Sequence, residues 1–448
     1  MAHYDLVLRG GTAVTPWTTQ QADIGVRDGR IASFAVTAAD SADQVLDCSG
    51  LHVLPGLMDP HVHLRDPGAA AVETISTGTK GAVLGGLTAV FDMPNTSPAI
   101  VDAERLAWKQ DYVEGGAGAA WCDMGLYVGA TKSNIAELAT LETGRGVCAV
   151  KVFAGSSTGD LLIEDDENLE RVMRSGVRRI AYHSEDEYRL KAREPMFAAG
   201  GPYRLHMEWR DEECAFLGTR RLMALARKTG RLAHVLHVST AQELEYLAAF
   251  RDIATIEVLV NHLTQVAPDA YDRLGGFGVM NPPIRGERHR QAAWEAVRDG
   301  TVDVIGSDHA PHPREAKLKP WPQCPAGLTG VQTLVPVMLD HVAAGRLSLE
   351  RLVDLMCAGP ARVYGVLGKG RLAMGYDADF TVVDLKAQRT IEDSWIASPC
   401  GWTPFAGMRI TGWPVMTVIR GKPVMREDAL IGTPSGRLVR FSGTQNAV

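Results

Sequence analysis

Between residues 56 and 367 the sequence alternates short apolar runs with longer amphipathic segments, and this alternation limits the fold more than any other feature. Alternating strands and helices are typical of a parallel sheet. About eight such strands favour a closed (β/α)8 barrel over an open sheet. The predicted strands are Leu57–His63, Ala89–Met93, Trp121–Val128, Ala149–Phe153, Ile180–His183, Ala233–Val238, Thr255–Val260 and Val302–Ser307.

Helical periodicity fills the segments between these strands, as in Asp211–Thr229, Gln242–Phe250 and Arg290–Asp299. No glycine-rich fingerprint of the GxGxxG or GxxxxGK[ST] type follows the early strands, which weakens a nucleotide-binding interpretation.

Both ends of the chain are rich in predicted strands instead. Asp28-Gly29 between two β-rich runs predicts a hairpin, and Gly10-Gly11 predicts a turn. Residues 380–383, 413–420 and 422–425 predict further strands near the C-terminus. We therefore expect an α/β protein, a (β/α)8 TIM barrel over residues 56–367 flanked by a β-sandwich built from residues 1–55 and 368–448.

Composition excludes several functional classes. The 448 residues are 46% hydrophobic and 22% charged, with a formal charge of −7 and no Lys/Arg block, which argues against nucleic-acid binding. No apolar run approaches the roughly 20 residues that span a bilayer, and the N-terminus lacks a signal-peptide pattern. Seven cysteines without any CxxC pair are expected to be free thiols. We expect a cytoplasmic enzyme.

The end of the first predicted barrel strand carries the strongest metal-site signal. His61 and His63 are two residues apart, so on a strand their side chains project from the same face. Barrel active sites lie at the C-terminal ends of the strands, and neutral imidazole is a common ligand of zinc and related ions. The sequence HVHLRDPG at 61–68 therefore predicts a metal site.

Three further predicted strand ends each supply a ligand type. His183 ends one strand, His237 lies in another, and Asp308 follows the last. A closed barrel would gather these three residues around one mouth together with His61 and His63.

Lys151 interrupts an otherwise apolar predicted strand, CAVKVF at 148–153. An unpaired ammonium there would be costly. Two solutions stay open: an ion pair, or reaction of the neutral amine with CO2 to give a carbamate. A carbamate could bridge two divalent cations roughly 3.5–4 Å apart, and such cations would disfavour the ammonium form.

Besides HVHLRDPG, seven motifs follow one another in a specific order. They are DMPNTSP at 92–98, VKVFAGSSTGD at 150–160, YHSEDE at 182–187, HVLHVST at 234–240, MNPPIR at 280–285, GSDHAPH at 306–312 and GLTGVQTLVPVML at 327–339. With them the chain resembles the cyclic amidohydrolases, and within them the dihydroorotases, over essentially its whole length. The likeness is greatest to the bacterial type whose bridging ligand is a carboxylated lysine.

This resemblance implies a binuclear centre of two divalent metal ions, usually Zn2+. His61 and His63 match the ligands of the more buried metal, and Lys151 matches the lysine that is carboxylated with CO2 and bridges the pair. His183 and His237 match the ligands of the second metal. The remaining ligand, Asp308, matches the aspartate that also acts as general acid and base.

The resemblance also implies the substrate contacts. Arg65, Asn95 and His312 match contacts to a substrate carboxylate, for which the planar fork of an arginine is well suited, and Asn281 matches a contact to the ring amide. The alternatives are a surface salt bridge for Arg65, turn capping for Asn95 and an exposed loop position for His312. Where many relatives have PHHL, this chain has VNHL at 260–263, so the role expected of His262 is structural.

The implied reaction is the reversible cyclisation of N-carbamoyl-L-aspartate to L-dihydroorotate plus water in de novo pyrimidine (UMP) biosynthesis, by a hydroxide held between the metals. Two alternatives stay open: an allantoinase or dihydropyrimidinase/hydantoinase-type enzyme, and a non-catalytic dihydroorotase-like subunit of aspartate transcarbamoylase. We also expect a homodimer and a lid at Pro313–Pro325. An association with aspartate transcarbamoylase is compatible with the resemblance.

Overall fold

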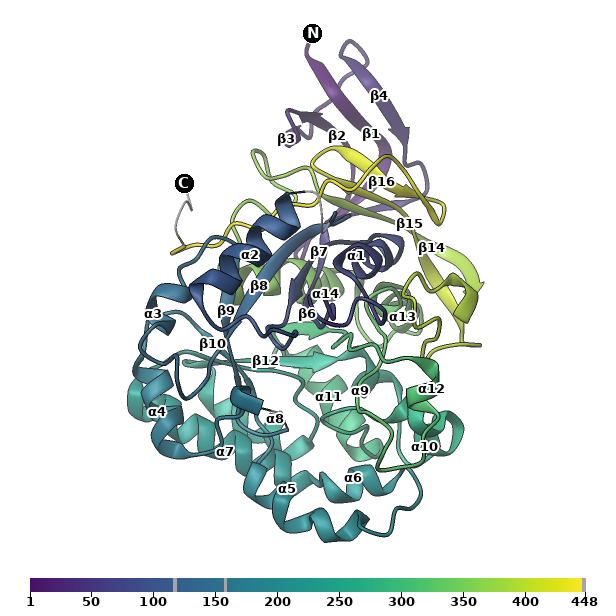
Figure 1. Cartoon of the computed structure of the whole chain (residues 1–448). Coiled ribbons are helices and arrows are strands. Elements are labelled where there is room, and N and C mark those ends of the chain that lie inside the picture. The colour runs from purple at the N-terminus through teal and green to yellow at the C-terminus, as the bar shows by residue number, and fades with distance from the viewer. Residues whose placement is uncertain (116–118, 157–158, 445–448) are drawn as a thin grey trace.

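The computed structural model describes residues 1–115, 119–156 and 159–444, and its centre is an eight-stranded parallel sheet (Figure 1). The strands follow one another from β6 to β13 in chain order. A parallel bridge between Val62 and His309 brings the two ends of the sheet together, so the sheet is a nearly closed TIM barrel. The strands are β6 (Leu57–Val62), β7 (Leu87–Asp92), β8 (Asp123–Gly129), β9 (Val147–Phe153), β10 (Ile180–His183), β11 (Ala233–Val235), β12 (Ala254–Leu259) and β13 (Val304–Gly306).

The barrel strands are almost entirely buried because helices cover their outer face. This two-sided burial explains their nearly continuous apolar sequences, and all eight predicted strands are confirmed. None of the described helices is long and apolar enough to cross a membrane. The helices are α1 (Ile75–Leu84), α2 (Ala103–Glu114), α3 (Leu138–Leu141), α4 (Asp166–Arg174), α5 (Glu187–Arg193), α6 (Leu205–Trp209), α7 (Glu212–Thr229), α8 (Ala241–Leu247), α9 (Val260–Thr264), α10 (Asp269–Leu274), α11 (Glu287–Asp299), α12 (Arg314–Lys317), α13 (Leu334–Ala343), α14 (Leu349–Val353) and α15 (Gly359–Tyr364).

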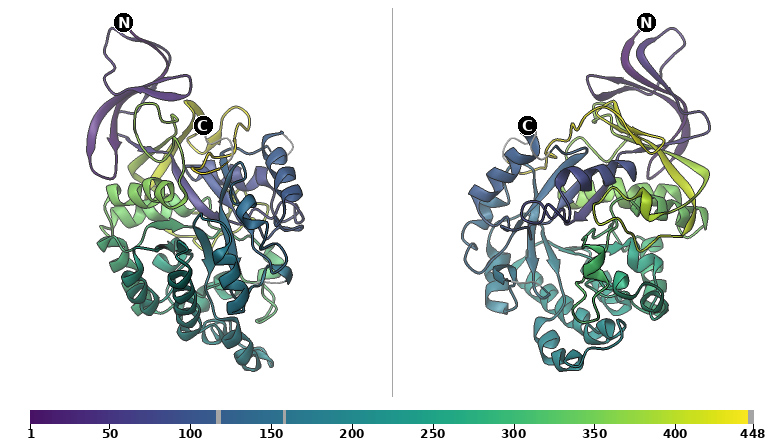
Figure 2. Two further views of the ribbon diagram at one scale, coloured as in Figure 1. Left: turned by 90° about the vertical axis from the view of Figure 1, so that its left-hand side faces the viewer. Right: turned by 45° about the vertical axis from the view of Figure 1, so that its right-hand side comes forward.

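Both chain ends join in one second sheet, which projects from one end of the barrel (Figures 1 and 2). Strand β5 is central to it, since it pairs in parallel with β1 and antiparallel with β14. The predicted flanking β-structure from both termini is confirmed, whereas the boundaries at residues 55 and 368 stay a prediction. Its strands are β1 (His3–Val14), β2 (Thr19–Arg27), β3 (Arg30–Ser33), β4 (Ser41–Asp47), β5 (His52–Pro55), β14 (Phe380–Thr390), β15 (Arg409–Ile419), β16 (Lys422–Arg426) and β17 (Ala429–Leu430).

The turn predicted at Gly10-Gly11 is wrong. Strand β1 continues through both glycines and pairs with β2 on either side of them, with a register shift between Leu8 and Gly11. Gly10 has a φ of +70°, a conformation that glycine adopts without the strain of a side chain. The glycines therefore form a bulge in a long strand, which sequence alone does not distinguish from a turn.

The C-terminal segment covers the N-terminal end of the barrel strands. Leu438 forms a parallel bridge with Met124 near the start of β8. Phe441 packs edge-on against Phe91 of β7, with ring centroids 5.4 Å apart. The opposite end of the barrel, where the strands finish, is left for the candidate site.

Candidate metal centre

Three predicted ligands converge at the C-terminal ends of the first and last barrel strands. His61 Nε2 lies 3.2 Å from Asp308 Oδ1, and His63 Nε2 lies 3.1 Å from the same oxygen. One ligand atom from each of these residues falls within 4.8 Å of the other two. This is the spacing expected of side chains that share one metal ion.

The Nδ1 atoms of His61 and His63 each form a hydrogen bond with a neighbouring side chain. His61 Nδ1 donates to Glu257 Oε1 at 2.7 Å, and His63 Nδ1 donates to Asn95 Oδ1 at 2.7 Å. In the neutral form of each imidazole these bonds leave Nε2 without a proton, and both Nε2 atoms are directed at Asp308. Carboxylate and carbonyl partners of this kind orient metal-binding imidazoles and raise their basicity.

His183 and His237 extend the cluster on the other side of the barrel. The His237 ring lies 5.3 Å from that of His61 and 4.5 Å from that of His183, measured between centroids. His183 Nε2 donates to Glu185 Oε2 at 2.8 Å, which leaves the lone pair of His183 Nδ1 available to a metal ion. Arg210 Nη2 in turn donates to Glu185 Oε2. The buried His237 Nδ1 has no hydrogen-bond partner within the described part of the chain.

Lys151 is buried on β9. Its Nζ lies 4.6 Å from the centre of the Phe153 ring, and no carboxylate among the described residues forms an ion pair with it. Burial lowers the pKa of this amine to about 7, against the attraction of Asp308 and Glu257. A large fraction of the Lys151 amine is therefore expected to be neutral near pH 7. The ion pair that was the other interpretation of Lys151 is not formed with any described residue.

The protonation states of three of the four imidazoles suit metal binding. Burial lowers the pKa of His63 to about 4 and also lowers the pKa values of His183 and His237, so these imidazoles are neutral at pH 7. Burial opposes a charge on His61, but Glu257 and Asp308 outweigh it and raise the pKa. For Asp308 burial is likewise outweighed, here by His61 and His63, and its pKa is lowered.

The backbone is unusual at the same place. Arg65, His237 and Asp308 have φ values of +21°, +39° and +49°, in a region that non-glycine residues rarely adopt. Such conformations cost of order 1–3 kcal/mol each and persist mainly where a site requires them. Their concentration beside the histidines marks this end of the barrel as functional.

The donor set fits divalent metal ions. Imidazole nitrogens and a carboxylate without cationic partners converge here, and the orphaned His237 Nδ1 and the unpaired Lys151 lack any other use in the described structure. Nitrogen and oxygen ligands of this kind suit zinc and similar ions.

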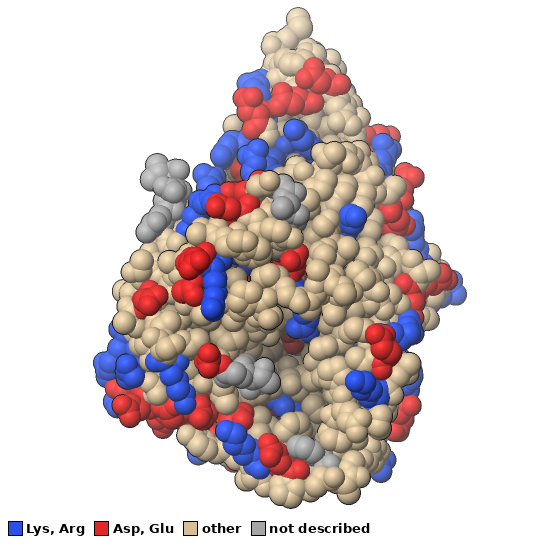
Figure 3. All heavy atoms as spheres, in the orientation of Figure 1, with Lys and Arg blue, Asp and Glu red and all other residues tan. Residues whose placement is uncertain are grey.

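Arg65 and His312 lie together on the rim. Arg65 Nε donates to Pro311 O at 3.1 Å, and its Nη2 lies 3.4 Å from His312 Nε2. His312 Nε2 also lies 3.0 Å from Ala326 O, so its proton is used there. Arg65 and Asn95 both line a cleft of about 850 Å³. On the face drawn in Figure 3 acidic and basic side chains are interspersed, and the surface is hollowed below its centre.

Asn281 and His262 are held by hydrogen bonds to residues other than the predicted metal ligands. Asn281 Nδ2 donates to Ser156 Oγ at 2.9 Å, while its Oδ1 accepts from His206 at 3.0 Å. The buried His262 donates to Pro282 O at 3.1 Å. The contact predicted between Asn281 and a substrate ring stays a prediction, as do the substrate contacts of Arg65, Asn95 and His312.

The predicted lid segment is anchored in this structure. Lys317 Nζ donates to the carbonyl oxygens of Val279, Pro325 and Gly327 at 2.7–3.0 Å. Arg314 Nη2 contacts Asp393 at 2.7 Å. The segment therefore covers the rim through fixed contacts, and its opening stays a prediction.

Two supporting carboxylates were missed by sequence reasoning. Glu257 interrupts the apolar strand TIEVL at 255–259 just as Lys151 interrupts its own strand, so the same signal could have found it. Glu185 lies in the YHSEDE motif but was not assigned a role. Each accepts a hydrogen bond from a predicted ligand, Glu257 from His61 and Glu185 from His183.

Comparisons with known proteins agree with this geometry. The sequence profile of the amidohydrolase family matches residues 52–424. A dihydroorotase from Pyrococcus furiosus is 34% identical, covering 94% of this chain and 92% of the relative, and an allantoinase from Deinococcus radiodurans is 35% identical, covering 97% and 98%. The solved structure of L-hydantoinase (dihydropyrimidinase) from Arthrobacter aurescens matches with a TM-score of 0.91 at 27% identity, covering 97% of this chain and 99% of that one. The chain thus belongs to the amidohydrolase family.

Proposed function

We propose that the protein is a dihydroorotase, which closes N-carbamoyl-L-aspartate to L-dihydroorotate plus water and also catalyses the reverse reaction. The observation that carries this proposal is the guanidinium of Arg65 beside the metal-ligand cluster. It is partly buried, burial lowers its pKa, and no carboxylate in the described ranges forms an ion pair with it. A buried arginine without an anion is suited to an anionic substrate.

The proposed centre contains two divalent metal ions, most simply Zn2+. His61, His63 and Asp308 would hold one, and His183 and His237 the other. Lys151 would bridge them after its neutral amine attacks CO2, forming an N–C bond and releasing one proton. The bound metals supply an acidified water and polarise the amide carbonyl.

Asp308 is the proposed proton carrier in the hydrolytic direction. Its carboxylate is ionised, since His61 and His63 lower its pKa, so it can accept a proton from the attacking water. The same oxygen can then deliver that proton to the leaving ring nitrogen. Glu257 and Asn95 keep the two imidazoles in the tautomer that leaves each Nε2 available.

A second candidate is hydrolysis of allantoin, because the Deinococcus radiodurans allantoinase is as similar to this chain as the Pyrococcus furiosus dihydroorotase. Allantoin and dihydrouracil are uncharged rings. Neither would use the guanidinium of Arg65 as an ion-pair partner, so this residue distinguishes the two proposals.

Substitution of Arg65 tests the assignment. For Arg65→Ala we expect kcat/KM for dihydroorotate to fall by about 100-fold or more, since a buried charge pair with substrate is lost. Arg105→Ala is the matched control, because Arg105 lines the same cleft but pairs with Asp102. Near-normal turnover of dihydroorotate by Arg65→Ala would contradict the proposal.

A further inference from the structure

A second cavity lies at the opposite end of the barrel from the metal centre. It has a volume of about 730 Å³ and is walled by the start of β8, the C-terminal segment and the terminal sheet. Asp123, the first residue of β8, lies on its floor. A strand of seven residues is roughly 20 Å long, so the cavity is well separated from the ligands at the strand ends.

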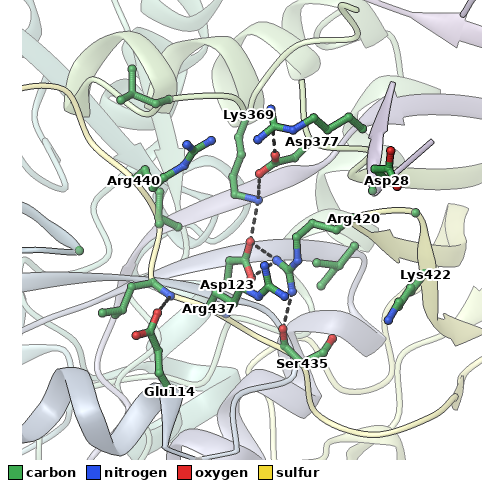
Figure 4. Close-up of a pocket in the computed structure, with 18 of the residues that line it drawn as sticks. Asp28, Glu114, Asp123, Lys369, Asp377, Arg420, Lys422, Ser435, Arg437 and Arg440 are labelled. Carbon is green, nitrogen blue, oxygen red and sulfur yellow. Dashed lines mark hydrogen bonds and ion pairs between the residues drawn. The ribbon is translucent and has the colours of Figure 1, made fainter. Parts of the chain in front are cut away.

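The floor of this cavity is a network of paired charges (Figure 4). The buried Lys369 Nζ lies 2.6 Å from Asp123 Oδ2, 3.1 Å from Asp377 Oδ2 and 2.6 Å from Asp379 Oδ2. Arg420 also pairs with Asp123. These ion pairs fix the floor, and they engage the carboxylates of Asp123, Asp377 and Asp379.

Three other cations around the cavity have no such partner. The exposed side chains of Arg437, Arg440 and Lys422 line it, and none makes a hydrogen bond or ion pair with a residue that the structure describes. In Figure 4, Arg440 and Lys422 flank the network from opposite sides, and neither is joined to an acceptor. Asp5 and Asp28 also line the cavity, but neither forms an ion pair with Arg437, Arg440 or Lys422 in the described structure, so Arg437 and Arg440 are left without a counter-ion.

The backbone leaves room for Arg440. Gly368 has a φ of +73°, which favours glycine, and a Cβ at this position would lie 3.3 Å from Arg440 Nη2. Neighbouring Glu114 does not neutralise the arginines, because it pairs with Arg145 and accepts from the Leu438 backbone.

We propose that this cavity binds a small anion carrying a diphosphate group. Guanidinium forks match phosphate oxygens in paired hydrogen bonds, and cavities of about 300–1,000 Å³ hold molecules of metabolite size. The ligand would contact both the C-terminal segment and the terminal sheet, and so would tie the sheet to the barrel. Inorganic pyrophosphate and a nucleoside diphosphate are two sources of the same group.

The test is calorimetric titration of the full-length, metal-loaded protein with pyrophosphate and, separately, with ADP. Saturable binding of either is expected, with tighter binding of ADP identifying a nucleotide as the source. The variant Arg437→Gln/Arg440→Gln should weaken binding by about tenfold or more. The control Arg298→Gln/Lys386→Gln removes two exposed charges elsewhere and should bind like the unmodified protein.

Thermal denaturation with and without ligand provides the second measurement. A bound anion should raise the melting temperature of the unmodified protein and of the control, but not of the double arginine variant. The proposal is overturned if neither ligand binds saturably, or if the double arginine variant binds as tightly as the control. Equal binding would place the anion elsewhere, for example on the metals.

Discussion

Glu257 should control the affinity of the metal centre without being a ligand itself. Its Oε1 accepts from His61 Nδ1 at 2.7 Å and from the backbone of His237 at 3.1 Å. Burial opposes its charge, but His61 and His234 hold the pKa of the carboxyl at about 2. The His61 imidazole therefore bonds to a full negative charge, which raises its basicity toward a metal.

The substitution Glu257→Gln isolates this effect. The amide oxygen can still accept both bonds, while its NH2 group replaces Oε2, which accepts no hydrogen bond in the described structure and lies 4.0 Å from His234 Nε2. A hydrogen bond to a charged group contributes about 1.5–3 kcal/mol and a neutral one about 1 kcal/mol. The difference of roughly 0.5–2 kcal/mol predicts a loss of about 2- to 30-fold in metal affinity.

Competition for zinc with a chelator of known affinity measures this loss, and thermal denaturation of the metal-free protein checks folding. Glu243→Gln is the matched control, since Glu243 is equally buried but bonds to Thr219, Ser239 and Thr240 instead of a histidine. A zinc affinity equal to that of the unmodified protein would refute the role of Glu257, and with it the assignment of His61 as a ligand.

Three further substitutions test other parts of the account. Lys151→Ala should lose bound metal on elemental analysis and reduce kcat on the order of 100-fold or more, and short carboxylic acids should restore part of the activity; full metal content and activity without them would count against a carbamate. Asp308→Asn should lower kcat by about 10²–10⁴-fold in steady-state assays, and an unchanged kcat would remove Asp308 as proton carrier. Lys369→Met leaves buried carboxylates unpaired and should lower the free energy of unfolding by about 3–5 kcal/mol in denaturant titration, whereas the exposed Lys386→Met should leave it unchanged.

The barrel and its ligand positions could be predicted because each depends on a local pattern. A strand covered on both faces reads as a continuous apolar run, and a polar residue at its end is then conspicuous, as at His183 and Asp308. The structure gathers the predicted ligands at one end of the barrel, while their roles as ligands stay predictions. The joining of both termini in one sheet also followed from their composition.

Other features depend on contacts between residues distant in sequence. The pairing of Glu257 with His61 joins β12 to β6 across the barrel, and no local pattern specifies it. His312 Nε2 donates to the carbonyl oxygen of Ala326, and this bond depends on the path that the rim segment takes. At Gly10 the sequence could not distinguish a bulge from a turn, because glycine suits the backbone of both.

The substrate of the enzyme is decided by one comparison of three cyclic amides. The purified, metal-loaded protein is assayed with L-dihydroorotate, allantoin and dihydrouracil under the same conditions, and kcat/KM is measured for each. We expect dihydroorotate to be preferred on the order of 100-fold or more, because only its carboxylate can pair with Arg65. Equal or greater kcat/KM for allantoin or dihydrouracil would contradict it.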